Sequence, residues 1–178
     1  YAAEKLKEYG AHAVTDVTGF SLMGHLVEIV KNSSVEVEID FDRLPLFKGL
    51  KELARRDVLP GAVERNRESV DVADYSMEEL TEGQKGVMFC PETSGGLLVF
   101  LPEDKAEAYV EDIRKNGSQD AAIIGKVAKP EEGGFRSFTA GARGLLNPPS
   151  KRAFVQHSLE PVMSKSEYFQ RGSGALND

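Results

Sequence analysis

A run of hydroxyl, carboxylate and glycine residues near the N-terminus is the part of this sequence best suited to chemistry. Residues 15–20 read Thr-Asp-Val-Thr-Gly-Phe and lie between a short extended stretch and an apolar helical pattern. Backbone N–H groups at a helix start favour anions, and a carboxylate there can hold magnesium, which often takes one or two carboxylates plus substrate phosphates. A plainer interpretation stays open: Thr15 or Asp16 caps the helix, worth about 1 kcal/mol.

A second candidate segment lies near the middle of the chain. Residues 91–98 read Pro-Glu-Thr-Ser-Gly-Gly-Leu-Leu, with two hydroxyls and two glycines just before an apolar run. Such a turn can cradle a phosphate, and it can equally be a tight turn that packs against another backbone. The residues alone do not decide between the two.

Hydrophobic periodicity predicts the elements that must position these segments. The patterns favour helices over 1–9, over 20–31, from 47 to near the turn pair at 60–61 and over 102–116, and strands over 11–16, 35–41, 87–90, 97–101, 121–127 and 135–139. Residues 61–76 are polar and predicted irregular, and Ser76 with Glu79 fits a capping box that would start a further short helix. This order predicts a mixed α/β (α+β) fold with one main sheet covered by helices.

The composition limits the classes of function. With 22 basic and 29 acidic residues the formal charge is −7, which disfavours nucleic acid and anionic membranes as partners. No apolar run reaches the roughly 18–20 residues that span a bilayer. The single cysteine fits a reducing compartment, and we expect a cytoplasmic protein.

The two segments together resemble the C-terminal half of selenophosphate synthetase (selenide, water dikinase) and, more broadly, the C-terminal domain of the aminoimidazole-ribotide-synthetase superfamily. The resemblance rests on residues 15–20 with the following Gly-His-Leu, on Glu-Thr-Ser-Gly-Gly-Leu-Leu at 92–98, on the loop 60–66 and on Ile-Ile-Gly-Lys-Val at 123–127. These matches run in order from about residue 10 to residue 127.

The resemblance implies an enzyme that makes selenophosphate from selenide, ATP and water, releases AMP and orthophosphate and requires Mg²⁺. It implies a three-layer α/β/α domain around a mixed sheet, with ATP between this domain and an N-terminal domain, and a homodimer. It makes Asp16 a magnesium ligand, with Thr15 and Thr18 beside it as candidates for phosphate contacts. We expect this domain to span residues 1–146, followed by a linker and a flexible or loosely docked tail over 147–178.

The resemblance also implies that essential parts lie elsewhere. The family's reactive cysteine or selenocysteine and its lysine belong to an N-terminal segment that this sequence lacks, so we assign no catalytic residue here. The chain does not begin with methionine, and we expect a C-terminal fragment that is inactive alone. Cys90 is predicted to be a buried, inert thiol. Ser21 replaces a glycine common in the family, a change that we expect to be tolerated.

Two other functions remain open: a related ATP-dependent synthetase or small-molecule kinase, and a non-catalytic binding or dimerisation module. The histidines, His12, His25 and His157, show no metal-ligand spacing. His25 is expected to be partly buried and satisfied by hydrogen bonding. Arg65 and Arg67 could approach phosphates, although a solvated charged loop explains them as well.

Overall fold

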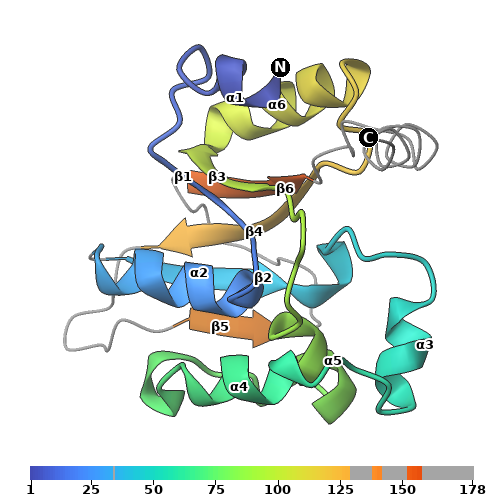
Figure 1. The fold of residues 1–178 in the computed structure, drawn as a ribbon. Coiled ribbons are helices and arrows are strands. Elements are labelled where there is room, and N and C mark those ends of the chain that lie inside the picture. The colour runs from blue at the N-terminus through green and yellow to red at the C-terminus, as the bar shows by residue number, and fades with distance from the viewer. Residues whose placement is uncertain (34, 129–137, 142–151, 158–178) are drawn as a thin grey trace, which may run out of the picture.

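A six-stranded mixed sheet runs through the middle of the molecule (Figure 1). The structure is a computed structural model that describes residues 1–33, 35–128, 138–141 and 152–157. The strand order is β1-β3-β6-β4-β2-β5, with β2 and β5 parallel and the other neighbours antiparallel. The strands are β1 (Ala13–Asp16), β2 (Glu36–Asp40), β3 (Leu97–Pro102), β4 (Ala122–Ala128), β5 (Phe138–Gly141) and β6 (Arg152–His157).

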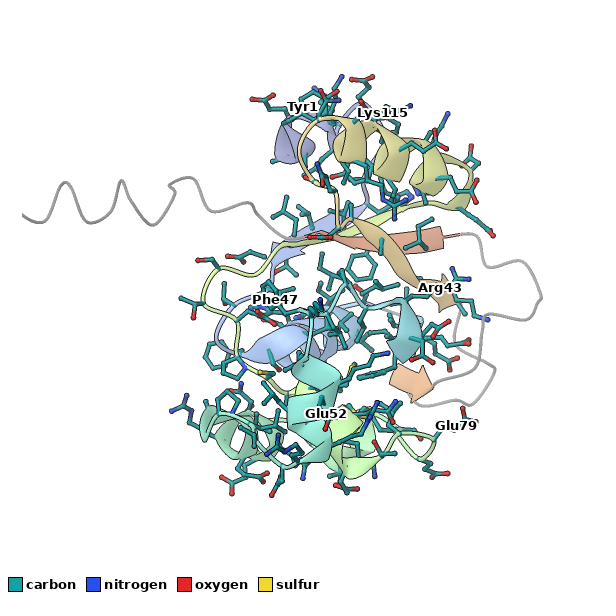
Figure 2. The ribbon with its side chains drawn as sticks, turned by 90° about the vertical axis from the view of Figure 1, so that its right-hand side faces the viewer. Tyr1, Arg43, Phe47, Glu52, Glu79 and Lys115 are labelled. Atoms are coloured by element: carbon teal, nitrogen blue, oxygen red, sulfur yellow. The ribbon has the colours of Figure 1, made fainter. Side chains whose placement is uncertain are left out.

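Helices cover both faces of the sheet, and Figures 1 and 2 show the resulting layers. α1 (Ala2–Lys5) and α6 (Glu103–Lys115) lie on one side, and the remaining helices lie on the other. Those are α2 (Ser21–Lys31), α3 (Leu50–Arg55), α4 (Ala62–Glu68) and α5 (Glu82–Met88), with short 3₁₀ turns at Phe41–Arg43 and Val72–Asp74. The three-layer α/β/α prediction is confirmed, and no helix of the described residues has the length and apolar character that crossing a membrane requires.

β3 shows why the sheet needs a helical layer on each side. Its alternate residues belong to different cores: Leu98 and Phe100 pack with α2, α4 and α5, whereas Val99 and Leu101 pack with α6 and α1. All four side chains are at most 4% exposed. A continuous apolar run of this length is typical of a strand buried on both faces.

The predicted secondary structure was wrong at three places between residues 61 and 90. The segment predicted to be irregular contains α4, and the helix predicted at Ser76 begins six residues later. Thr81 and Gln84 form the capping box there, because the same spacing of hydroxyl and amide recurs five residues after Ser76. The strand predicted at 87–90 is the end of α5, since a short apolar run fits a buried helix as well as a strand.

The predicted tail contains a strand of the sheet. β6 pairs with β3 on one side and with β4 on the other, so a flexible or loosely docked tail is wrong for Arg152–His157. The predicted linker at 147–150 and residues 158–178 lie outside the described residues. The division at residue 147 otherwise stays a prediction. The strand predicted at 135–139 overlaps β5 at residues 138 and 139, and residues 135–137 lie outside the described residues.

Candidate functional site

The two candidate segments lie against each other at one end of the sheet. The Val17 N–H continues the β1–β3 ladder by donating to the Gly96 carbonyl at 2.9 Å, and the Glu92 N–H donates to the Thr18 carbonyl at 3.1 Å. Residues 92–96 therefore form a turn that packs on residues 17–18. The interpretation of this segment as a turn that packs against another backbone is confirmed, and the phosphate interpretation stays a prediction.

Gly95 makes the close approach possible. A Cβ at this position would overlap the carbonyl oxygen of Val17 and would lie 2.9 Å from Cβ of Glu92. Real Cβ atoms do not tolerate such contacts with backbone, so this glycine is required by packing rather than by a positive φ. The turn is held in place by its backbone.

Thr18 and His25 form the best-defined polar contact of the site. The Thr18 N–H donates to Nε2 of His25 at 3.2 Å, and the Thr18 hydroxyl oxygen lies 3.0 Å from the same nitrogen. Both residues are half-buried, as the sequence predicted for His25. The Thr18 N–H is occupied by His25, so it is not among the backbone N–H groups that an anion could use here.

Thr15 and Asp16 project to opposite faces of β1, because neighbouring side chains alternate along a strand. Thr15 lies with Ala13 and His25 in a groove of about 330 Å³ between β1 and α2, and its hydroxyl donates to the Asp16 carbonyl at 3.1 Å. Asp16 is exposed, and its carboxylate makes no hydrogen bond or ion pair within the part of the chain that the structure describes. Thr15, Asp16 and Thr18 are thus close in sequence, but the side chains of Thr15 and Asp16 project to opposite faces of β1.

The helix-cap interpretation is wrong for both residues. The N-cap position of α2 is Phe20, and no side chain caps this helix. Ser21 instead begins the helix with φ +72°, in the left-handed region that favours glycine. The positive φ agrees with the glycine that the resemblance leads us to expect here. Ser21 accepts the backbone strain, and its Oγ accepts a hydrogen bond from the Gly24 N–H at 3.4 Å.

Asn66 fixes the segment from the other side, and the sequence analysis did not single it out. Its side chain is 3% exposed, and Nδ2 donates to the Gly19 carbonyl at 2.9 Å and the Phe89 carbonyl at 3.0 Å. It thereby joins α4 and the end of α5 to the turn before α2. An asparagine in an otherwise charged stretch was the available signal, but its partners are backbone groups that no side-chain pattern reveals.

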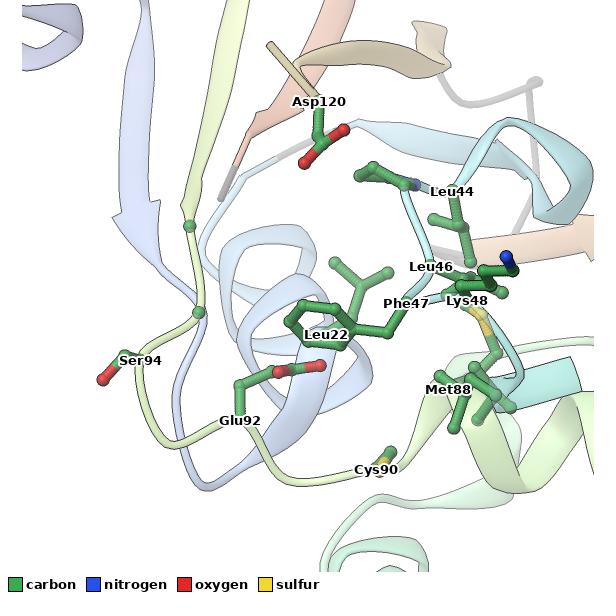
Figure 3. A pocket seen from close by; sticks show the side chains of 15 residues that line it. Leu22, Leu44, Leu46, Phe47, Lys48, Met88, Cys90, Glu92, Ser94 and Asp120 are labelled. Carbon is green, nitrogen blue, oxygen red and sulfur yellow. The ribbon is translucent and has the colours of Figure 1, made fainter. Parts of the chain in front are cut away.

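A pocket of about 360 Å³ opens beside the turn (Figure 3). Its walls include Leu22, Phe47 and Met88, and Glu92 points into it next to the Phe47 ring. Burial raises the pKa of the Glu92 carboxyl. Burial, followed by the charge of Glu92, raises the pKa of the Cys90 thiol, which disfavours the reactive thiolate. Cys90 is half-buried and lines the pocket rather than being fully buried as predicted, and its inertness stays a prediction.

The arginines of the earlier hypothesis lie on α4 rather than in a loop. Arg67 lies 3.9 Å from Glu64 and 3.8 Å from Glu82, and its guanidinium lies 5.9 Å from the centre of the Phe89 ring. Arg65 is exposed on the same helix. The structure thus places Arg67 in a local charge network, in line with the solvated interpretation.

The donor set fits magnesium only in part. No group of three or more His, Cys, Asp or Glu side chains that could hold a metal occurs among the described residues. Asp16 supplies one exposed carboxylate, and carboxylate oxygens are the hard ligands that magnesium prefers. Any magnesium bound here would take its other ligands from phosphates, water or another part of a larger protein.

Fold and site together define a two-sided α/β domain that presents a carboxylate and hydroxyls at a strand-to-helix junction. The family model "AIR synthase related protein, C-terminal domain" matches residues 1–137, and the chain belongs to this family.

Curated relatives carry the name selenide, water dikinase. The chain is 36% identical over 132 residues to "Selenide, water dikinase 2" of Peptoclostridium acidaminophilum. The aligned part is 74% of this chain and 38% of the relative. The chain is 37% identical over 131 residues to "Selenide, water dikinase" of Caldanaerobacter subterraneus subsp. tengcongensis, with the same coverages. The protein of that name from Pseudomonas straminea is 36% identical over 124 residues, 70% of this chain and 35% of the relative. The chain thus spans little more than a third of these relatives.

Proposed function

We propose that this chain is the C-terminal half of an ATP- and Mg²⁺-dependent enzyme that makes selenophosphate from selenide, ATP and water and releases AMP and orthophosphate. The observation that carries the proposal is the similarity, at 36% identity over 132 residues, to a protein named for the selenide, water dikinase reaction. The match covers only 38% of that relative, so the activity belongs to a longer protein.

Asp16 is the proposed magnesium ligand. Its exposed carboxylate has no hydrogen-bond or ion-pair partner among the described residues, and Asp16 is the last residue of β1, directly before segment 17–20. Bound magnesium would neutralise charge on phosphate oxygens. Thr18 and Thr15 are the proposed phosphate contacts, and Thr18 is the better placed because its hydroxyl can turn away from His25 to donate to a phosphate oxygen.

One carboxylate does not position a triphosphate, so the proposal includes an N-terminal domain that supplies the remaining groups. Exposed aromatic rings at this end of the domain support it. Phe20 is 67% and Phe47 74% exposed, and Phe47 lines the pocket together with Leu22, two residues after Phe20. Large exposed apolar side chains beside a pocket are typical of a contact surface. We extend the proposal to a homodimer and, from the single cysteine, to a cytoplasmic location.

The test is phosphorus NMR on a full-length enzyme that carries this chain as its C-terminal half, run without oxygen with ATP, Mg²⁺ and selenide. We expect signals of selenophosphate and AMP, and a loss of turnover of about a hundredfold or more in Asp16→Asn, because metal-assisted charge stabilisation is worth several kcal/mol. Asp104→Asn is the control and should keep turnover, because this exposed carboxylate lies in the first turn of α6, beyond the opposite end of β3 from Leu97, the register partner of Asp16.

Two results would contradict the proposal in different ways. Near-normal turnover in Asp16→Asn would remove Asp16 from the site while leaving the reaction in place. ATP that stays intact with folded wild-type enzyme would reject selenide as the substrate and favour a related ATP-dependent synthetase or kinase.

A further inference from the structure

His25 faces the site from the helix that follows it. It lies one turn inside α2, whose neighbouring residues Met23 and Leu26 are fully buried, so the backbone that carries the imidazole is fixed by the core. The Phe20 ring packs edge-on against the imidazole, with ring centres 6.4 Å apart and an interplanar angle of 76°. Nε2 is therefore held facing Thr18.

The contact with Thr18 assigns the tautomer of a neutral imidazole. A backbone N–H can only donate, so Nε2 must accept from Thr18 with its lone pair and the ring proton must sit on Nδ1. The Thr18 hydroxyl lies 3.0 Å from the same nitrogen. Because the N–H already uses the lone pair of Nε2, the hydroxyl can turn outward without leaving this nitrogen unpaired.

The surroundings of the ring contain few charges. Besides Thr15, the groove beside His25 is lined by Ala13, Glu28, Ile29, Asn32 and Ser33. Glu28, which precedes Ile29 on α2, is the only titratable group among these lining residues, and β1 contributes none to the groove.

We propose that His25 is a positioning residue for the reaction: its neutral imidazole holds the Thr18 backbone and so fixes the position from which the Thr18 hydroxyl meets a phosphate. This inference rests on the proposed function for the identity of the ligand. The contact itself is independent of that function. His25 touches neither substrate nor metal in this scheme and acts only through Thr18.

The first test measures the imidazole directly in this 178-residue chain. Long-range proton–nitrogen NMR at neutral pH on protein labelled at histidine nitrogens should show His25 with an unprotonated Nε2 and a protonated Nδ1. His25→Gln and His12→Gln assign the signals. A proton on Nε2 of neutral His25 would overturn the proposal whatever the enzyme does.

The second test uses conservative variants of the full-length enzyme. Gln carries its amide oxygen at about the reach of Nε2 and can accept the Thr18 N–H, whereas Asn is too short. We expect His25→Asn to lower kcat by about ten- to a hundredfold, the cost of misplacing a reacting group by about 1 Å, with a smaller change in KM for ATP. His25→Gln should stay within about threefold of wild type, and so should His12→Asn, the exposed control.

A double-mutant cycle with Thr18→Val separates positioning from a general effect on folding. Because His25 acts through Thr18, adding His25→Asn to Thr18→Val should lower kcat less than it does in wild type. Independent, multiplicative losses would overturn the proposal, as would equal losses in His25→Gln and His25→Asn. Failure of the wild type to make selenophosphate would instead reject the proposed function, and the NMR result would still stand or fall by itself.

Discussion

Replacing Asn66 by aspartate tests how the candidate site is held together. Asn66→Asp keeps the size and shape of the side chain but removes the two N–H donors. The carboxylate oxygen that takes the place of Nδ2 then faces the carbonyls of Gly19 and Phe89, at the present distances of 2.9 and 3.0 Å. The perturbation is therefore electrostatic, and no cavity is created.

The expected cost follows from burial. The side chain is 3% exposed, so water cannot replace the lost donors at the Phe89 carbonyl, which is buried, although the exposed Gly19 can find water. Leaving one buried acceptor unsatisfied costs about 1–3 kcal/mol, and an unpaired buried charge costs about 3–5 kcal/mol. We expect Asn66→Asp to lower the free energy of unfolding by about 3–5 kcal/mol at pH 7. This is a large share of the total, because the free energy of unfolding of a typical domain is about 5–15 kcal/mol.

The assay is urea unfolding followed by circular dichroism, with Asn116→Asp as the matched control. Asn116 also makes two side-chain hydrogen bonds, to the carbonyl and Oδ1 of Asp112 at 2.9 and 3.2 Å, but it is exposed. Water can satisfy the groups that it leaves, so its loss should stay below about 1 kcal/mol.

The pH dependence gives a second, independent check. The new carboxyl at position 66 would have a folded-state pKa above its unfolded value of about 4, so the penalty should be smallest below pH 4, grow as the pH rises from about 4 to the folded pKa and stay constant above it. A protonated carboxyl can again donate to one of the two carbonyls. Equal losses at positions 66 and 116, or a loss that does not change with pH, would refute the hydrogen bonds that this reasoning uses.

Three other substitutions probe separate features. Gly95→Ala should lower the melting temperature and cost at least about 1–3 kcal/mol, because its methyl group overlaps backbone; Gly19→Ala, with nothing within 4 Å of its Cβ, is the control, and equal effects would contradict the close packing. Ser21→Gly should stabilise the fold by up to about 1 kcal/mol in urea unfolding, because it relieves the positive φ; a loss would mean that the serine hydroxyl matters more than the strain. Tyr109→Phe should cost about 1 kcal/mol through the lost 3.2 Å bond to the Ala2 carbonyl. Burial raises the pKa of Tyr109 to about 12, so the wild type should lose stability as the pH rises from 10 to 12. Alkaline unfolding curves of the variant should show a smaller loss, the remainder coming from groups such as Tyr1 and Tyr9, whose pKa values are also raised.

The elements that were predicted best are those that bury one face, or both faces, in a hydrophobic core. α2 and α6 have clear apolar stripes, and β3 is an unbroken apolar run, so each was predicted to within a few residues. Burial of these faces is what stabilises the elements, and periodicity reports burial directly. The three layers could thus be predicted, with the resemblance supplying their arrangement.

The sequence could not predict α5, because its glycines serve packing. A Cβ at Gly83 would lie 2.7 Å from the carbonyl oxygen of Ala54, and one at Gly86 would overlap Leu59. Glycine lowers intrinsic helix propensity by about 1 kcal/mol, so it argued for a short element here. The close approach of α3 and its following loop outweighs that propensity, and this contact joins residues about 30 positions apart.

β6 escaped prediction for a related reason. It lies between β3 and β4, whose residues precede it by at least 24 positions, and its registers pair Phe100 with Phe154 and Lys126 with Ala153. A short apolar stretch after a proline-rich segment resembles a tail when only its neighbours are considered. Its place in the sheet depends on pairing with distant strands, which the residues around β6 do not reveal.

The candidate site shows the same division between side-chain identity and geometry. Residue types and order were enough to select Thr15, Asp16 and Thr18 and to recognise the family. The contacts that orient them were missed, since Asn66 reaches carbonyls 47 and 23 positions away and Gly95 meets the carbonyl of Val17, just after β1. Backbone acceptors are the same in every residue and leave no mark in a side-chain pattern.

These contacts use backbone groups and leave the Asp16 carboxylate without a hydrogen bond or ion pair among the described residues, whereas the Thr15 and Thr18 hydroxyls each lie within hydrogen-bond distance of a partner. His25 accepts from the Thr18 N–H, the Glu92 N–H donates to the Thr18 carbonyl and Asn66 donates to the Gly19 carbonyl. The segment is thus fixed by groups other than those that would meet magnesium and phosphate. Fixing them in advance avoids the cost of ordering a loop on binding, which is how a preorganised site gains affinity and rate. Substitution of a holding residue should therefore weaken binding even where Asp16 and Thr18 are intact.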